Sequence, residues 1–285
     1  MKKTDFIHYI LVALFTVSLA TATGDTQPET SRSKVFRFGV LPEQAAGKLL
    51  ESWAPLLSYL EQYTGYRFVF ETAPDIPTFE ARIESGEYDF AYLNPYHFTV
   101  FNKGEQGYQA VAKARNRLVR GVLVVRKDSH IVSPSGLAGE TLAFPAATAF
   151  GASILPRAHL GSAKISYDIR YVSSHDSVYR AVAEGFFSAG GGIVRTLDNL
   201  DPDVRGQLRV LWASTDYTPH AIAARSEVDV AVRMSVRQSL NTMHDNNDGR
   251  EALKILKLPG FESADNSDWD DVRSLHIDTY LSDVN

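Results

Sequence analysis

The sequence contains no cysteine among its 285 residues. Disulfides, thiolate catalysis, Cys-ligated zinc, iron–sulfur clusters and a lipid-anchored N-terminal cysteine are therefore excluded. It also has no excess of basic residues, because 29 lysines and arginines face 34 acidic residues for a net charge of -5. Nucleic-acid phosphates must be matched by clustered Lys and Arg, so we expect no nucleic-acid partner.

The catalytic motifs of common enzyme classes are missing too. The sequence has no G-x-S-x-G, no H-E-x-x-H and no phosphate-binding P-loop, which are the signatures of hydrolases, zinc proteases and nucleotide-binding enzymes. We predict that the protein is not an enzyme, has no catalytic residues, and uses neither a metal ion nor an organic cofactor.

The composition is that of a globular protein. Hydrophobic residues make up 44% of the chain and charged residues 22%, which is neither disordered nor fibrous composition. The length corresponds to one large or two modest domains with a substantial core.

The N-terminus carries the pattern of a secretory signal peptide. Lys2 and Lys3 precede an apolar run over residues 9–20, and Ala20-Thr21-Ala22 offers the small-x-small pattern that signal peptidase reads. The run is short for a membrane-spanning helix, although an uncleaved anchor is the alternative. We predict cleavage near Ala22, a polar leader over residues 23–33, and a mature protein exported to the periplasm.

After the leader, strand and helix patterns alternate. Apolar residues at period two predict strands, and apolar residues three or four apart predict helices. The first set comprises strands at 35–41, 66–72 and 88–93, with helices at 49–63 and 76–85. The second set comprises strands at 118–126, 141–144, 169–172, 187–193 and 208–213, with helices from 145 to about 159 and at 176–183. A strand at 220–225 and helices near 228–243, 250–256 and 269–280 end the chain.

Two α/β units follow from this order. The chain crosses between them twice, around residues 114–117 and 214–217. The pattern fits either two independent domains or two lobes of a clamp in which the second lobe is inserted into the first.

Four stretches of sequence resemble a known family. They are SGEYDFAYLNPYHF (85–98), LAFPAATAFGASILPRAHL (142–160), YVSSHDSVYRAVAEGFFSAGGG (171–192) and LRVLWASTDYTPHAIAAR (208–225). Their order and spacing resemble the periplasmic substrate-binding components of phosphate, phosphite and phosphonate ABC transporters.

The resemblance implies the type II periplasmic binding protein fold, an α/β fold with two lobes, mostly parallel sheets flanked by helices, and two hinge crossovers. Lobe 1 would then comprise residues 34–115 and 215–285, and lobe 2 residues 116–214. The implied function is capture of a small oxyanion by lobe closure, by a monomer that delivers it to an ABC transporter permease. The alternative is an exported sensor that presents its closed form to a membrane histidine kinase.

The resemblance also selects candidate ligand-binding residues. Thr148, Ala149 and Phe150 lie between a strand and a helix, where free N–H groups and a hydroxyl can bind an anion, although Thr148 could also simply cap the helix. The family places a Ser-Thr-Ser-Gly run here, from which this chain departs. A histidine at the position of His175 reaches the oxyanion in the family.

Further candidates lie at the edges of the predicted cleft. Tyr92, Asn94 and Tyr96 follow the third predicted strand, where ligand-binding residues of such sheets occur. Arg195 and His220 align with positions where binders of aminoalkylphosphonates carry acids, although either could be an ordinary surface residue. A cation there repels an ammonium group, so we expect a fully anionic ligand to be preferred over 2-aminoethylphosphonate.

Overall fold

The structure is a computed structural model that describes residues 34–103 and 107–277. The predicted signal peptide and leader lie outside these residues. The chain divides into Met1–Arg32 and a compact unit, Ser33–Asn285, which contains every element described. No helix within the described ranges is both long and apolar enough to cross a bilayer.

The first lobe is built on a six-stranded sheet with the order β11-β4-β10-β3-β1-β2. Strands from both ends of the compact unit contribute to it. They are β1 (Val35–Val40), β2 (Arg67–Glu71), β3 (Phe90–Leu93), β4 (Gln109–Ala114), β10 (Ala221–Ala224) and β11 (Phe261–Ser263).

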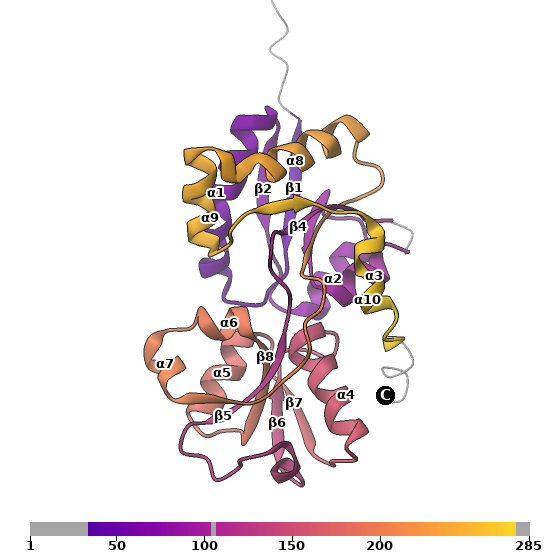
Figure 1. Cartoon of the computed structure of the whole chain (residues 1–285). Coiled ribbons are helices and arrows are strands. Elements are labelled where there is room, and N and C mark those ends of the chain that lie inside the picture. Colours follow the sequence, from indigo (N-terminus) through magenta and orange to yellow (C-terminus); the bar gives the residue numbers. More distant parts are fainter. Residues whose placement is uncertain (1–33, 104–106, 278–285) are drawn as a thin grey trace, which may run out of the picture. The chain divides into compact units, whose positions relative to one another are not determined.

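Helices cover both faces of this sheet (Figure 1). Phe90 and Tyr92 of β3 pack in the core with α1 (Ala46–Thr64), α8 (Val230–Thr242) and α9 (Asn247–Leu256). The alternate residues Ala91 and Leu93 pack with α2 (Ile76–Glu84), α3 (Pro95–Phe101) and α10 (Asp270–Arg273), because successive strand residues point to opposite faces. α1 ends where Gly65 adopts a left-handed φ of 74° and its N–H bonds the Glu61 carbonyl, as expected of a glycine C-cap.

The second lobe contains a five-stranded sheet with the order β7-β6-β8-β5-β9. Its strands are β5 (Gly121–Arg126), β6 (Thr141–Phe144), β7 (Asp168–Tyr171), β8 (Ala189–Ile193) and β9 (Leu208–Ala213). One face packs against α4 (Leu155–Ser162), and the other against α5 (His175–Ala183), α6 (Val194–Asp198) and α7 (Pro202–Gly206). Short turns complete the chain: η1 (Pro134–Leu137), η2 (Phe150–Ile154), η3 (Met243–Asp245) and η4 (Asn266–Trp269).

The prediction of mostly parallel sheets holds for the direction of the strands, but not for every pair of neighbouring strands. Among the described strands, β1 pairs in parallel with β2 and β3, and β6 with β7 and β8. The other five ladders, which involve β4, β5, β9, β10 and β11, are antiparallel. The sheets are therefore mixed, because the strand that follows each crossover, β5 or β10, runs against the direction that most strands of its sheet share, as does the short β11.

Two predicted helices also differ from the structure. The helix expected from residue 145 begins at Phe150 with a π-type turn, η2, and continues as α4 to Ser162. In place of a helix at 269–280 the structure has η4 followed by α10, and residues 278–280 lie outside the described part.

Two crossovers, at residues 115–120 and 214–220, connect the lobes, and they run side by side. Val119 and Tyr217 exchange backbone hydrogen bonds of 2.9 and 3.0 Å. The Arg120 guanidinium binds the Asp216 carboxylate through two hydrogen bonds of 2.8 and 2.6 Å. Two paired connecting segments of this kind can act as a hinge that absorbs a relative rotation of the lobes.

The glycines of β8 allow a helix start to lie directly on the strand. A Cβ at Gly191 would lie 1.8 Å from the Ala152 carbonyl oxygen, and one at Gly192 would lie 1.8 Å from the Tyr179 hydroxyl. Any larger residue would push η2 and α5 away from the sheet. Because these residues of β8 have no side chains, η2 and α5 pack directly on the strand, and their N-terminal ends lie next to lobe 1.

Candidate functional site

A buried carboxylate lies where the two lobes meet. Glu43 follows β1, and only 5% of its side chain is exposed. Its Oε2 accepts a hydrogen bond from the Arg195 guanidinium on α6 of lobe 2. Its Oε1 accepts from His220 Nε2 at 2.7 Å, and His220 directly precedes β10 of lobe 1. One internal anion is thus bound by side chains from both lobes.

The start of α5 also binds Glu43. The His175 backbone N–H donates to the Glu43 carbonyl oxygen at 3.0 Å. Ser174 caps the helix by accepting from the Ser177 N–H at 3.1 Å. The His175 ring is buried, and its Nδ1 lies 2.9 Å from the Thr196 hydroxyl. Lobe 1 therefore occupies the first amide of a helix that, in the sequence-based prediction, faces the ligand.

Tyr92 stacks against the same cluster. Its ring lies 5.0 Å from the His220 ring in a stacked arrangement, and the Arg195 guanidinium lies 6.0 Å above its centre. On its other side, Trp53 of α1 packs at 4.5 Å between ring centroids. A cation over an aromatic face is attracted by the ring quadrupole, so Tyr92 helps to hold Arg195 in place.

The charges of this cluster depend on one another. Burial alone would raise the pKa of Glu43, but Arg195 and His220 outweigh it and hold that pKa well below its usual range. Burial would likewise lower the pKa of Arg195, yet the Glu43 carboxylate raises it. Burial lowers the pKa of His175 to about 4 and raises that of Tyr92 to about 12. At neutral pH, Glu43 is charged and His175 is neutral.

This arrangement predicts that stability falls with acid. A neutral buried His175, with a pKa of about 4 against 6.5 in the unfolded chain, binds fewer protons than the unfolded state between those values. The free energy of unfolding should therefore fall as pH drops from 6.5 to 4, by at most about 1.4 kcal/mol per pH unit. Urea unfolding across this range measures the slope.

Two histidine variants make this prediction specific. His175→Gln should flatten the slope, whereas His130→Gln, at an exposed position, should leave it unchanged. An equal slope in wild type and His175→Gln would contradict the assignment.

A small inner cavity of ≈10 Å³ adjoins the cluster. It is lined by residues from both lobes, including Glu43, Asn94, Ala149, Phe150, His175 and His220. Ala149 and Phe150 open the η2 turn, whose first N–H groups have no partner within the turn. A water molecule needs about 10–15 Å³. The cavity therefore has room for about one water while Glu43 is in place.

Thr148 does not direct its hydroxyl toward this cavity. The hydroxyl donates a hydrogen bond to the Glu80 carboxylate. This bond and His97 together outweigh the effect of burial, so that the pKa of Glu80 is lowered. The Thr148 carbonyl accepts from Asn94 Nδ2 at 3.3 Å. Asn94 also caps α3 by accepting from the His97 N–H at 2.8 Å. Thr148 and Asn94 thus link the two lobes.

The predicted residues therefore divide into two groups. Tyr92, His175, Arg195 and His220 surround the Glu43 carboxylate, and Asn94, Ala149 and Phe150 line the adjoining inner cavity. Tyr96 is instead packed in the apolar core beside His97, with 6.2 Å between ring centroids, and it lines neither this cavity nor the outer pocket.

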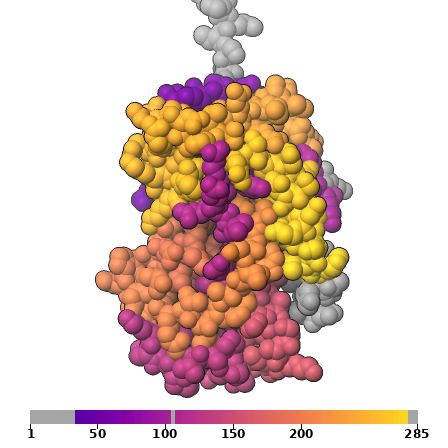
Figure 2. Space-filling view, in the orientation of Figure 1, coloured from indigo at the N-terminus to yellow at the C-terminus, as the bar shows by residue number. Residues whose placement is uncertain are grey.

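An outer pocket of ≈280 Å³ opens onto the cluster from the crossovers. It shares Tyr92, Arg195 and His220 with the cluster, and its other walls come from the first crossover, α6 and the end of α9. Residues 116–118 of that crossover are exposed, and Figure 2 shows the crossover (magenta) running across this face.

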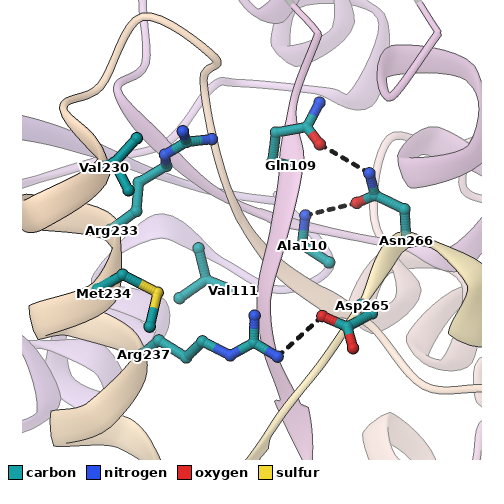
Figure 3. Close-up of a pocket in the computed structure, with 9 residues that line it drawn as sticks. All are labelled: Gln109, Ala110, Val111, Val230, Arg233, Met234, Arg237, Asp265 and Asn266. Carbon is teal, nitrogen blue, oxygen red and sulfur yellow. Dashed lines mark hydrogen bonds and ion pairs between the residues drawn. The ribbon is translucent and has the colours of Figure 1, made fainter.

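A separate pocket of ≈350 Å³ lies on lobe 1 between α8, β4 and the start of η4 (Figure 3). Arg237 and Asp265 form an ion pair of 2.9 Å across it. It contains none of the residues predicted from the sequence. Within residues 34–103 and 107–277, no group of three His, Asp or Glu side chains is placed to hold a metal ion.

Glu43 is the residue that sequence reasoning missed. Locally it looks like an ordinary loop acid between Pro42 and Gln44. Its one signal is position, because it comes immediately after a buried strand at the ligand-binding edge of an α/β sheet.

Comparison with known proteins supports the fold. The family model described as ABC transporter, phosphonate, periplasmic substrate-binding protein matches residues 38–269. A protein of Mycolicibacterium smegmatis described as phosphate-import protein PhnD is 23% identical over 265 residues, which cover 83% of this chain and 81% of that protein.

Solved structures show the same architecture. A binding protein component of an ABC phosphonate transporter from Pseudomonas aeruginosa has a TM-score of 0.79 at 18% identity, covering 88% of this chain and 87% of that one. PhnD1 of Prochlorococcus marinus, solved with methylphosphonate, has a TM-score of 0.79 at 14% identity, covering 87% and 98%. The two-lobed α/β fold predicted from the sequence is confirmed.

Proposed function

Since the chain belongs to the family of periplasmic substrate-binding proteins of phosphonate ABC transporters, we propose that it captures a small phosphonate- or phosphate-like anion between its two lobes. One observation carries this proposal. The Glu43 carboxylate is buried between Arg195 and His220, so the contact between the lobes is already arranged around an anion. A ligand with acidic oxygens can make the same charge-assisted hydrogen bonds.

In the proposed mechanism the ligand replaces the Glu43 carboxylate. The inner cavity of ≈10 Å³ is too small for a phosphonate while Glu43 remains in place. The lobes therefore part on the two crossovers, Glu43 leaves Arg195 and His220, and the lobes close on the anion.

Each candidate residue has a role in this exchange. Arg195 and His220 bind the acidic oxygens, and the first amide of η2, at Phe150, supplies a further donor. The His175 amide of α5 joins them once the parting of the lobes frees it from the Glu43 carbonyl oxygen. Tyr92 forms an apolar wall for the ligand. Asn94 holds the η2 loop through its bond to the Thr148 carbonyl, and Tyr96 supports β3 and α3 from the core.

The partner and location follow from the family, whose members are periplasmic components of transporters rather than enzymes. We propose that signal peptidase removes residues 1–22, and that the mature protein acts as a monomer that delivers its ligand to an ABC permease. Nothing in the comparisons favours the alternative of a sensor for a histidine kinase.

Isothermal titration calorimetry tests this function. We expect inorganic phosphate and methylphosphonate to bind the mature protein with a dissociation constant of about a micromolar or below, which corresponds to about 8 kcal/mol. Methanesulfonate and acetate serve as matched anions of lower charge and should bind more weakly. Absence of binding by both phosphorus compounds, with the protein shown folded by circular dichroism, would exclude the proposal.

A further inference from the structure

The outer pocket has more positive charge than one small oxyanion needs. Four basic side chains line it, namely Arg117, Arg120, Arg195 and Lys257, against the single carboxylate of Asp198. Two of these cations are already paired: Arg195 binds Glu43 and Arg120 binds Asp216.

The other two basic side chains have no such partner among the described residues. Within the described residues, the side chains of Arg117 and Lys257 form neither an ion pair nor a hydrogen bond, and both residues are exposed. They lie on different elements, Arg117 on the first crossover and Lys257 at the end of α9. Unpaired cations are ordinary on an open surface, but these two line one pocket that leads to the half-buried Arg195.

Lys257 also occupies an unfavourable backbone position. It ends α9 with a left-handed φ of 55°, where glycine is the usual residue because a Cβ is strained there. A lysine at this place is less favourable than glycine.

We propose that the ligand of this chain carries a second acidic group, which binds in the outer pocket between Arg117 and Lys257. This inference rests on the proposed capture of a first anionic group at Arg195 and His220. The inner cavity accepts only the group that replaces the Glu43 carboxylate, so the rest of the ligand must extend into the ≈280 Å³ outside it. The ligand class is a phosphonate or phosphate ester with a second carboxylate or phosphoryl group a few carbon atoms away.

A matched pair of probes tests this inference. 3-Phosphonopropionate and propylphosphonate share the three-carbon chain and the phosphonate, and differ in the terminal acid. Calorimetry at low salt should show wild type binding 3-phosphonopropionate about tenfold or more tightly than propylphosphonate, because two cations without ionic partners face the extra carboxylate and little salt screens them. 2-Aminoethylphosphonate should bind more weakly than propylphosphonate, because its ammonium faces the same cations.

The double variant Arg117→Gln/Lys257→Gly should reduce the ratio of the two dissociation constants to about one. Glycine at 257 relieves the left-handed position, so loss of the ratio would not reflect a weakened helix end. Arg233→Gln is the control, since Arg233 lines the separate pocket of Figure 3, and it should keep the wild-type ratio.

The outcomes separate the two proposals. Equal binding of both probes by wild type, or an unchanged ratio in the double variant, would overturn the second acidic group while leaving anion capture intact. Failure of wild type to bind either probe or phosphate would overturn both.

Discussion

Arg195→Gln should lower the affinity for methylphosphonate by about a hundredfold or more and also destabilise the protein. The variant removes the guanidinium that would bind the ligand anion, and truncating one partner of a buried, hydrogen-bonded charge pair costs about 2–5 kcal/mol of binding free energy. In the absence of ligand, the Glu43 carboxylate would keep only the hydrogen bond with His220, and breaking a buried ion pair costs about 3–5 kcal/mol of folding stability. Calorimetry and urea unfolding measure the two effects.

The double variant Glu43→Gln/Arg195→Gln separates binding from stability. It removes the uncompensated carboxylate together with its partner, so most of the lost folding stability should return. Affinity should not return, because the cation is still missing. If Arg195→Gln bound methylphosphonate as tightly as wild type, Arg195 would have no place in the anion site.

Glu43→Gln is expected to have the opposite effect on binding, raising the affinity for methylphosphonate about tenfold or more. In the proposed mechanism, the wild-type carboxylate competes with the ligand for Arg195 and His220. The apparent affinity of a protein is lowered in proportion when only a small fraction of its molecules is in the binding-competent state. A neutral glutamine competes less, because it makes no charge-assisted bond to the guanidinium.

Small-angle scattering gives this prediction an independent readout. Without ligand, Glu43→Gln should have a larger radius of gyration than wild type, because the link from Glu43 to lobe 2 is weakened, and it should become more compact when methylphosphonate is added. Glu51→Gln is the matched control at an exposed position on α1. A lower affinity in Glu43→Gln would mean that Glu43 contacts the bound ligand rather than competing with it.

Much of the fold could be predicted from apolar periodicity. β1 and α1 bury their apolar residues at regular spacing, and β3 and β6 are short apolar runs buried almost throughout, so their patterns are strong. β4 was missed because its sequence, Gln-Ala-Val-Ala-Lys-Ala, has a single β-branched residue and resembles a helix or a loop. β11 has only three residues, too few for a period to be visible.

The candidate site was predicted only in part, for a different reason. Near the ligand-binding edge, Tyr92 lies toward the end of β3, His175 and Arg195 lie at the starts of α5 and α6, and His220 directly precedes β10. Topology therefore brings them together. Glu43 bonds residues 152 and 177 positions away, and no local pattern reports such a contact. The same limit applies to Thr148, whose hydroxyl is bound by Glu80 of lobe 1. Hydrogen-bond partners that lie on different lobes are therefore identified only from the folded structure.

A crystal structure of the mature protein with methylphosphonate is the most direct test of the claim that Glu43 marks the anion site. The account predicts phosphonate oxygens within hydrogen-bonding distance of the Arg195 guanidinium and His220 Nε2, with the Glu43 carboxylate moved away from both. A complex in which methylphosphonate binds elsewhere, while Glu43 still bonds Arg195 and His220, would contradict it.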